Sequence, residues 1–480
     1  MYVIMNYKEL GFKCGLELHQ RLQSHKLFCS CPSALRDDPP DIIIKRKLRA
    51  VAGETGMVDI AAKHAMEKSQ EFIYEGYSDT NCLVEFDDEP PHKLNEEALN
   101  IVLEVALLLK CEIVDELHFM RKTIIDGSNT SGFQRTALLA RNGFIETSKG
   151  NVIIGSIYLE EESAKNVKES SDNRTWRLDR LGIPLIEIQT EADILDEKHA
   201  KETAEKIGMI LRSTNKVMRG IGSIRQDVNI SIKGHPRVEI KGFQDIRLME
   251  NVIKNEVERQ LESLKTKKDL FGHVRNVKID GSTEFLRPLP GSSRMYPETD
   301  VPIFPILKER VKSIILPEII TEKAIRFEKQ YNLSPEIANL IIKENPSLFE
   351  NFVNRFKNLE PSLIAKTMTL TLSDLKSRQN LDISRIKDQD VEELFSYLNS
   401  KKIDQSLINQ YLKDKIEEKN INLENYKVID QKEVEKIVQE AINQNKSSSA
   451  NAIMGIVMTR IKGRADGRKV MEIIKKYTRN

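Results

Sequence analysis

The 480-residue sequence has no surplus charge of either sign, few cysteines and no long apolar run. Its 74 Lys and Arg residues nearly balance its 73 Asp and Glu residues, which excludes a wholly basic nucleic-acid coat protein but not a local basic patch. Five cysteines are too few for a disulfide framework and are typical of a reducing compartment. No window approaches ~18 consecutive apolar residues, and the start, MYVIMNYKELGF, lacks the apolar segment of a signal peptide. We therefore expect a cytoplasmic protein with no membrane span.

The sequence also lacks the common nucleotide-binding and hydrolase motifs. It has no P-loop, because the nearest match, GNVIIGS at 150–156, lacks the lysine and is typical of a strand. It has no protein-kinase catalytic loop, no G-x-G-x-x-G turn after a strand, and no Ser/Lys or catalytic-Cys hydrolase constellation. Cys29 and Cys31 form a C-x-C with His25 upstream, but the other cysteines offer no second close pair. This spacing does not predict a zinc site, and we expect the remaining cysteines to be small buried side chains.

What is present predicts packed domains of mixed structure. Hydrophobic residues make up 40% and charged residues 31% of the chain, which is too apolar for a disordered protein. Up to about residue 305, short β-like runs alternate with amphipathic helical patterns, which predicts an α+β fold. The clearest predicted strands cover 14–22, 151–162, 182–190, 226–234 and 236–243, and the clearest predicted helices cover 96–109, 197–212 and 245–265.

The character of the sequence changes after about residue 310, where only helical patterns remain. Pro317, Pro335, Pro346 and Pro361 each open a helical stretch, and Ser-Pro and Asn-Pro at 334–335 and 345–346 fit an N-cap followed by proline in the first turn. From residue 446 to the end there are nine Lys/Arg and two Asp/Glu residues. We predict three domains, 1–308, 309–425 and 426–480, the last of them basic.

Alternation along the predicted strands places acidic side chains on shared faces. Because neighbouring side chains of a strand point to opposite faces, Glu17 and His19 share one face of GLELHQ, opposite Leu16 and Leu18. Comparable polar positions on the other strands are Glu187, Arg225, Asp227, Glu239 and the consecutive carboxylates Glu160, Glu161 and Glu162.

Two interpretations of this polar face remain open. An antiparallel sheet with one solvated face alternates in the same way. However, several carboxylates that face one concavity repel one another unless a cation neutralises them, and carboxylates with an imidazole suit Mg²⁺ or Mn²⁺. The second interpretation is thus a metal-dependent phosphoryl-transfer site on a sheet face. The loop DGSNTSGFQRT at 126–136, next to Arg121 and Lys122, is either a phosphate- or ribose-binding loop or an ordinary surface loop.

Several strings together resemble one family. They are GLELHQRL (15–22), KLFCSCPS (26–33), GETGMVD (53–59), MRKTIIDGSNTSGFQRT (120–136), RLDRLGIPLIEI (177–188), GSIRQDVNISI (222–232), VEIKGFQ (238–244) and RPLPGSSRMYPETDVP (287–302). The chain resembles the kinase subunits of tRNA-dependent amidotransferases, the GatB/GatE family, most closely the archaeal GatE type, with the bacterial GatB type as the next relative. The resemblance covers nearly the whole chain and extends to the basic tail.

The resemblance implies a function and a fold. Members of the family use ATP and Mg²⁺ to phosphorylate the γ-carboxylate of Glu-tRNA(Gln), and ammonia then displaces phosphate to give Gln-tRNA(Gln). The implied partners are an asparaginase-like amidase, the D-type subunit, which supplies the ammonia, and the mischarged tRNA, in a heterotetramer of two E-type and two D-type chains. The implied fold is a glutamine synthetase-like cradle (1–308), followed by a helical domain (309–425) and a YqeY-like tail (426–480) that hold the tRNA.

The resemblance also implies roles for individual residues. Glu17, His19, Glu160, Glu161, Glu187 and Glu239 are implied metal ligands, and Glu17, His19, Glu161, Glu187 and Lys122 the catalytic set. The nucleotide and its phosphates are expected at Arg121, Lys122, Ser128, Asn129, Arg225, Asp227 and Glu239.

The chain departs from the family pattern in two places. The usual LEED string ends here in Glu162 instead of aspartate, which keeps the charge but lengthens the side chain. The large aspartyl-tRNA synthetase-like insert of the archaeal GatE type is absent between about Lys268 and Glu284. Two alternatives stay open: a B-type enzyme that also acts on Asp-tRNA(Asn), and a non-catalytic tRNA-binding assembly protein.

Overall fold

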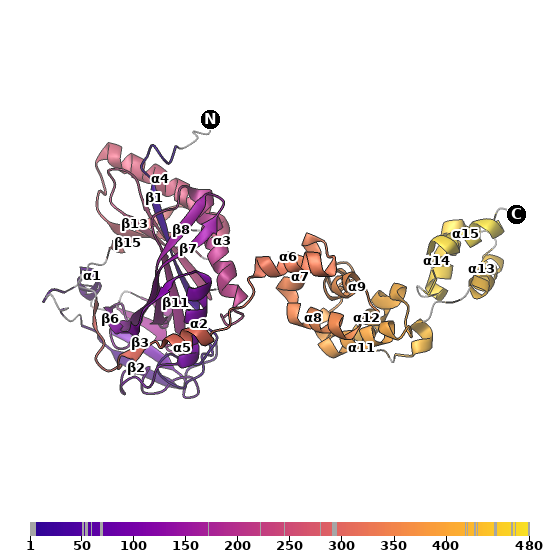
Figure 1. The fold of residues 1–480 in the computed structure, drawn as a ribbon, viewed down its shortest axis with the longest axis horizontal. Coiled ribbons are helices and arrows are strands. Elements are labelled where there is room, and N and C mark those ends of the chain that lie inside the picture. Colours follow the sequence, from indigo (N-terminus) through magenta and orange to yellow (C-terminus); the bar gives the residue numbers. More distant parts are fainter. Residues whose placement is uncertain are drawn as a thin grey trace. The chain divides into compact units, whose positions relative to one another are not determined.

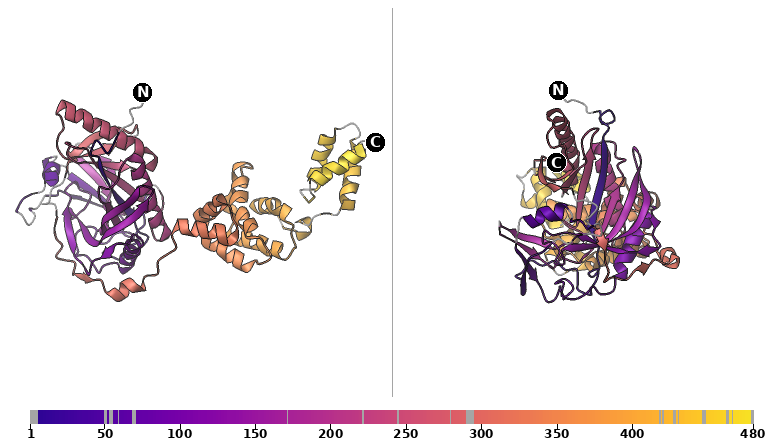
Figure 2. Two further views of the ribbon diagram at one scale, coloured as in Figure 1. Left: turned by 45° about the horizontal axis from the view of Figure 1, so that its top comes forward. Right: turned by 90° about the vertical axis from the view of Figure 1, so that its left-hand side faces the viewer.

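The structure is a computed structural model that divides into two compact units, residues 1–319 and 320–480 (Figures 1 and 2). It describes residues 6–478 except 50–51, 53–55, 59, 68–70, 171, 221, 244, 279, 290–294, 418, 420, 427–428, 430, 446–448, 462–463 and 466. Parts of the strings GETGMVD and RPLPGSSRMYPETDVP therefore lie outside the described residues. In the described part of the chain, no helix is long and apolar enough to cross a membrane.

The first unit is built on an eleven-stranded mixed sheet. Its order is β15-β14-β13-β12-β1-β11-β8-β7-β6-β16, with β4 paired to β7, and only the β13–β14 pair is parallel. The strands are β1 (Lys13–Arg21), β4 (Glu112–Ile113), β6 (Phe119–Thr123), β7 (Phe133–Thr147), β8 (Gly150–Glu161), β11 (Pro184–Thr190), β12 (Ile224–Ser231), β13 (Val238–Phe243), β14 (His273–Val277), β15 (Thr283–Pro288) and β16 (Met295–Pro297). All five predicted strands are confirmed within a few residues.

One face of this sheet packs on helices. Leu16 and Leu18 of β1 are 1% and 0% exposed, because alternation turns them toward α2 (Glu96–Leu108), α3 (Glu197–Ser213) and α4 (Met249–Thr266). Asn95 caps α2 and Asp196 caps α3 through their side chains. Burial of these apolar side chains removes them from water and fixes which face of β1 points away from the helices. The three predicted helices are thus confirmed; in the third, a 3-10 turn, η1 (Ile246–Leu248), precedes α4.

Smaller elements complete the first unit. A four-stranded sheet has the order β2-β3-β10-β9, and a two-stranded sheet pairs β17 with β5. These strands are β2 (Ile42–Arg46), β3 (Glu71–Gly76), β5 (Glu116–Leu117), β9 (Lys165–Glu169), β10 (Asn173–Arg177) and β17 (Phe304–Pro305), and the short helices are α1 (Ile60–Glu67) and α5 (Lys308–Ser313). Only a short connection, 267–272, joins α4 to β14.

In the second unit, the regular elements that the structure describes are all helices. Its helices are α6 (Ile320–Tyr331), α7 (Pro335–Glu344), α8 (Pro346–Arg355), α9 (Pro361–Lys366), α10 (Leu372–Ser377), α11 (Asp388–Asn399), α12 (Ile408–Ile416), α13 (Gln431–Gln444), α14 (Ala450–Ile461) and α15 (Gly467–Thr478); a π-helical turn, Thr367–Thr371, joins α9 to α10. The Ser334 and Asn345 side chains cap α7 and α8 as predicted. Residues 324–426 and 434–474 bury two separate hydrophobic clusters.

Candidate active site

The acidic face is the name used here for the face of the large sheet opposite the helices, where Glu17 and His19 lie. β1 is central, and its antiparallel neighbours β11 and β12 place Glu187 directly opposite His19 and Asp227 directly opposite Glu17. Directly opposed residues of antiparallel strands point to the same face. Three strands that are far apart in the sequence therefore bring their polar side chains together.

Glu17, His19 and Glu187 form a compact triad. The His19 Nε2 atom lies 3.0 Å from Glu187 Oε2 and 3.4 Å from Glu17 Oε1. One ligand atom from each residue lies within 4.8 Å of the other two, so a single cation can contact all three. Two carboxylates and an imidazole supply oxygen and nitrogen ligands of the kind that divalent metal ions accept.

Burial and mutual charge shift the pKa values of the triad residues. Burial and the neighbouring Glu187 raise the pKa of Glu17 to about 7, against the opposing charges of His19 and Lys241. Burial opposes ionisation of His19, but its hydrogen bond to Glu187 raises its pKa to about 9. Burial also acts against Glu187, yet Lys122 and His19 hold its pKa well below the usual value. Burial and the close approach of two carboxylates thus act together at Glu17, and His19 and Lys122 offset them at Glu187.

Lys122 and Glu160 extend the triad along β6 and β8. The Lys122 ammonium lies 2.6 Å from Glu160 Oε1 and 3.3 Å from Glu187 Oε2. Gln134 donates to the other oxygen of Glu160 over 3.1 Å. A largely buried lysine-carboxylate pair of this kind holds a positive charge at a fixed place beside the triad.

On the other side of β1, Asp227 and Glu239 share Lys241. The Lys241 Nζ atom lies 2.6 Å from Asp227 and 2.5 Å from Glu239. Arg225 pairs over 2.7 Å with Glu162, whose pKa is lowered by Arg225 and nearby arginines although burial opposes this. Glu162, the residue that replaces aspartate in LEED, is thus bound to an arginine of the acidic face.

Two of the predicted site residues, Arg121 and Glu161, lie on the opposite face. Alternation along β6 and β8 turns them away from Lys122 and Glu160. Arg121 donates to Glu298 over 2.6 Å, Arg135 donates to Glu298 over 2.7 Å, and Arg135 lies 3.3 Å from Glu161. These four residues form a group of two cations and two carboxylates, which we call the ion-pair cluster; Arg121 also donates to Asp300 at its exposed edge over 2.9 Å. The structure does not bring Arg121 and Glu161 to the triad.

Ser128 and Asn129 lie in the loop between β6 and β7, next to Ser163, which follows β8. Both side chains are buried, and the Asn129 Oδ1 atom accepts hydrogen bonds from Ser128 and Ser163. Gly127 has φ +88°, and a Cβ there would lie 2.2 Å from Phe72, so the loop packs closely against β3. The loop is not an exposed surface loop. Its two side chains are not free for a ligand either, because they form hydrogen bonds within the protein. Small residues in a sequence do not distinguish a ligand-binding loop from a packed one.

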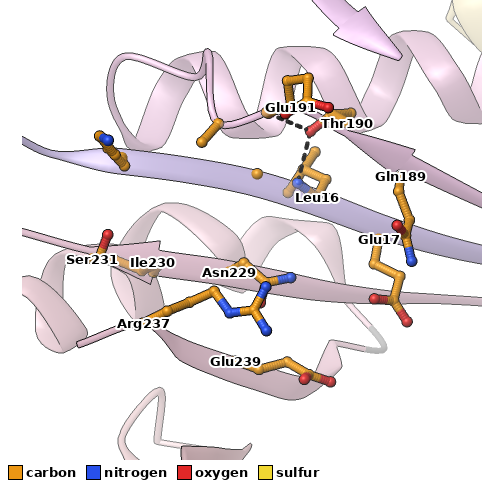
Figure 3. Close-up of a pocket in the computed structure, with 13 residues that line it drawn as sticks. Leu16, Glu17, Gln189, Thr190, Glu191, Asn229, Ile230, Ser231, Arg237 and Glu239 are labelled. Carbon is orange, nitrogen blue, oxygen red and sulfur yellow. Dashed lines mark hydrogen bonds between the residues drawn. The ribbon is translucent and has the colours of Figure 1, made fainter. Parts of the chain in front are cut away.

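A pocket of about 440 Å³ adjoins the triad along the acidic face (Figure 3). Glu17 lines it together with Asn229 of β12 and Glu239 of β13. Arg237, directly before β13, lines it as well. The Asn229 Oδ1 atom is buried and has no hydrogen-bond partner among the residues that the structure describes. The guanidinium of Arg237 is exposed and makes no hydrogen bond or ion pair with any described residue. Arg237 escaped the sequence analysis, although it shares the alternation of Glu239 and Lys241.

Comparison with known proteins decides the family. The GatB/GatE catalytic domain matches residues 12–312, and a second GatB domain matches residues 347–477. The chain is 38% identical to the GatE-type glutamyl-tRNA(Gln) amidotransferase subunit of Methanocaldococcus jannaschii, over 98% of this chain and 99% of the relative. It is 36% identical to the GatE-type subunit of Methanococcus vannielii, over 97% of each chain, and 34% identical to that of Saccharolobus solfataricus, over 99% of each.

The chain belongs to the GatB/GatE family. As a GatB/GatE protein it is a ligase-type subunit of a multi-subunit, tRNA-dependent amidotransferase, and the family's reaction implies ATP. The predicted family and α+β fold are confirmed.

The alignment with the Methanocaldococcus jannaschii relative runs over 624 positions, which exceeds the 480 residues of this chain. That GatE relative therefore carries residues that this chain lacks. The short connection 267–272 between α4 and β14 agrees with the absence of an insert at this point.

Proposed function

We propose that the chain phosphorylates the γ-carboxylate of glutamate on tRNA(Gln) with ATP and then amidates it with ammonia. The observation that carries this proposal is the Glu17–His19–Glu187 triad, which adjoins both Lys122 and the pocket that Glu17 lines. Ammonia does not displace an oxide ion from a carboxylate at a useful rate, so the oxygen has to become part of a leaving group first. A site that holds phosphates and a carboxylate side by side meets this requirement.

Mg²⁺ is the proposed metal, held by Glu17, His19 and Glu187, with Asp227, Glu160 and Glu239 close by on the same face. When bound, it supplies charge neutralisation of the nucleotide phosphates. The donor set fits because two carboxylates and an imidazole from neighbouring strands present one ligand atom each within 4.8 Å of the others. Arg121 and Glu161, bound in the ion-pair cluster, support the ends of β6 and β8 in this proposal and do not contact the metal.

The pocket beside Glu17 is the proposed seat of the nucleotide. Arg237 offers an unpaired cation for a phosphate, and the Asn229 Oδ1 atom offers an unused acceptor for a donor group of the ligand. Gly15 lets β1 approach the backbone of residues 190 and 191 beside the pocket, since a Cβ there would lie 3.2 Å from their two carbonyl oxygens. This assignment moves the nucleotide away from Ser128 and Asn129.

The phosphoryl transfer is then an in-line displacement. A γ-carboxylate oxygen of the glutamyl group attacks the γ-phosphorus, and ADP leaves. Lys122, fixed between Glu160 and Glu187, lies where it can neutralise the transferring phosphoryl oxygens. Ammonia then attacks the acyl carbon, loses a proton, and expels phosphate to leave the amide.

The ammonia source and the tRNA contacts lie outside the triad. We propose an asparaginase-like amidase of the D type as the source, in a heterotetramer of two E-type and two D-type chains, since the sequence carries no hydrolase constellation.

The tail is the proposed tRNA contact. One side of α15 is buried through Val470, Ile473 and Ile474, while its basic side chains are exposed: Arg468, Lys469, Lys475 and Lys476.

The decisive experiment mixes the purified chain with Glu-tRNA(Gln), ATP, Mg²⁺ and ammonium chloride. We expect tRNA-dependent ADP release and Gln-tRNA(Gln) formation. If neither product forms in the presence of a functional amidase partner, the proposal is contradicted. That result favours a non-catalytic assembly protein. Asp-tRNA(Asn), tested in parallel, separates the B-type alternative, and free glutamate tests whether the reaction requires the tRNA.

The tail is tested by deletion. Removal of residues from 430 onward should raise the KM for tRNA more than it lowers kcat, because phosphate contacts contribute to ground-state binding. An unchanged KM contradicts the proposed contact.

A further inference from the structure

Arg21 is a buried cation on the acidic face, and the structure shows no partner for its charge. It follows His19 by two positions on β1, so alternation turns both side chains to the same face. The residue is 5% exposed, and its Nε atom is buried with no hydrogen-bond partner among the described residues. Its guanidinium also makes no ion pair with any of them. A buried charge without a partner is costly, and it persists where a ligand completes the site.

The two carboxylates whose charges act on Arg21 have other partners. They are Glu162 and Asp179, which follow β8 and β10. Glu162 pairs with Arg225 over 2.7 Å. Asp179 is fully buried and accepts hydrogen bonds from two backbone N–H groups over 2.7 and 2.9 Å. Neither carboxylate is therefore bound to Arg21.

Arg180 adds more positive charge beside Arg21. The charges of Arg21, Arg225 and Glu162 all act on it. Its guanidinium donates to two backbone carbonyl oxygens shortly after β8, over 2.8 and 2.7 Å, and to no described carboxylate. Arg225 lies directly opposite His19 of the triad in the pairing of β1 with β12. Three guanidinium groups thus accompany two carboxylates beside the triad, which leaves one positive charge in excess.

The backbone of Arg21 is fixed through both of its hydrogen-bonding groups. Its N–H donates to the carbonyl oxygen of Ser223 over 3.1 Å. Its own carbonyl oxygen accepts from the N–H of Met218 and from the side chain of Gln20, each over 2.9 Å. The unpaired guanidinium is therefore carried on a rigid point of the sheet, so binding of an anion there does not require the backbone to become ordered.

The order of side chains along β1 indicates which anion reaches Arg21. Lys13, Gly15 and Glu17 line the proposed nucleotide pocket. His19 of the triad comes next, and Arg21 lies ~7 Å further along the strand. The nucleotide and Arg21 are thus on opposite sides of His19. An in-line displacement brings the attacking oxygen from the side opposite the leaving group, so the acceptor carboxylate has to enter at the Arg21 side.

We propose that Arg21 binds the γ-carboxylate of the glutamyl group on the tRNA and positions it for attack on the nucleotide. This inference rests on the proposed function, because that function supplies the acceptor. A guanidinium binds a carboxylate through two parallel N–H···O bonds, and its charge offsets the repulsion between the substrate and the carboxylates of the triad. The amide of the product is neutral and loses this pairing. Arg21 therefore sets a preference for the glutamyl ester over the glutaminyl ester.

The test compares the binding of three forms of one tRNA to the full-length chain, with Mg²⁺ and a non-hydrolysable ATP analogue present. The forms are uncharged tRNA(Gln), Glu-tRNA(Gln) and Gln-tRNA(Gln). We expect the wild-type chain to bind Glu-tRNA(Gln) at least about tenfold more tightly than Gln-tRNA(Gln), because the amide offers no charge to the guanidinium. Arg21→Gln should remove this preference and leave the affinity for uncharged tRNA unchanged. Because no turnover is needed, the result is separate from the test of the proposed function.

Three binding results overturn the proposal. The first is equal affinity of the wild-type chain for the two charged forms. The second is an unchanged preference in Arg21→Gln, which shows that Arg21 does not recognise the carboxylate. The third is an equal loss of affinity for all three forms, which shows that Arg21 contacts a tRNA phosphate instead.

Thermal unfolding separates substrate binding from a structural role of Arg21. Arg21→Met, which removes the charge and keeps much of the volume, should also lose the preference. The melting temperature of both Arg21 variants should not fall, because removal of an unpaired buried charge relieves a cost. If only one of the two variants folds, its binding decides; if neither folds, Arg21 serves the fold and the proposal is overturned.

Arg275→Gln is the matched control. Arg275 is a half-buried arginine of β14 that donates to Thr283 through two hydrogen bonds of 2.7 Å. It lies opposite Ile240, a core residue of β13, and thus on the helix side of the sheet. This variant should keep the preference for Glu-tRNA(Gln), and loss of the preference here as well overturns the assignment to Arg21.

Discussion

The acidic face and the ion-pair cluster share strands β6 and β8 and use basic and acidic side chains alike, yet they differ in how completely their charges are balanced. On β6 and β8, Lys122 and Glu160 point to the acidic face, while Arg121 and Glu161 point to the other. In the cluster, Arg121 and Arg135 form ion pairs with Glu161 and Glu298. Each of the four charged groups has a partner of opposite charge within 3.3 Å. On the acidic face, Lys122 and His19 do not balance the carboxylates around them, and the pKa of Glu17 rises to about 7.

This difference separates stability from function. A closed ion-pair group in a buried position fixes geometry, because removal of one partner leaves the other charge uncompensated. An unbalanced group is costly to bury and persists where a ligand completes it. The comparison predicts that substitutions on the two faces fail in different ways.

The largest expected effect is on activity, from Glu187→Gln. Loss of this carboxylate removes a ligand of the proposed metal and a partner of both His19 and Lys122. We expect kcat with Glu-tRNA(Gln) and ATP to fall by about 10³-fold or more, with little loss of melting temperature. Glu104→Gln is the control: Glu104 is also buried and pairs with a lysine, Lys216, but it lies on α2 away from the acidic face. Near-normal turnover in Glu187→Gln contradicts the assignment of the triad.

The next effect is on stability, from Glu298→Gln in the ion-pair cluster. The substitution leaves Arg121 and Arg135 without their shared carboxylate, and we expect the free energy of unfolding to fall by about 3 kcal/mol. Trp176, the one tryptophan of the sequence, lies buried in β10 and reports unfolding of the first unit by fluorescence in urea. An unchanged transition midpoint shows that the cluster does not contribute to stability.

The pH dependence of that difference is a further prediction. Burial opposes ionisation of Glu298, but Arg121 and Arg135 lower its pKa in the folded state below the ordinary value. A group with a depressed folded pKa contributes stability above the unfolded pKa of about 4.5 and loses it as the pH falls through the folded value. The stability gap between wild type and Glu298→Gln should be widest near neutral pH and narrow below about pH 4.5. A gap that stays constant from pH 7 to pH 3 argues against an ionic origin.

The smallest expected effect is on ATP binding, from a substitution of Arg237 in the proposed nucleotide pocket. Arg237→Ala should raise the KM for ATP about tenfold, worth ~1.4 kcal/mol, and change kcat little, because an exposed phosphate contact contributes mainly to ground-state binding. Lys233→Ala is the control, since Lys233 is exposed nearby but does not line the pocket. Equal effects of the two substitutions place the nucleotide elsewhere.

Much of the fold was predictable because local patterns determine it. The alternation in GLELHQ predicted β1 and its two faces, and Ser334-Pro335 and Asn345-Pro346 predicted the starts of α7 and α8. The candidate site was predictable as far as strand alternation reaches, which includes Glu17, His19 and Glu187. Glu161 and Arg121, which the resemblance places in the site, lie on the other face, since three consecutive glutamates cannot all point to one face and neighbouring basic residues cannot either.

The sequence by itself determined which residues alternate, where helices begin, and the family to which the chain belongs. The tertiary structure decided which other side chains those residues contact. Register placed Glu187 and Asp227 on either side of β1, because strand pairing joins segments that are far apart in the chain. Loop packing buried Ser128 and Asn129, and it brought Cys82 and Glu85 to the C-x-C at Cys29 and Cys31. Such contacts depend on the summed burial of a whole core and not on spacing along the sequence, so they appear only once the chain has folded.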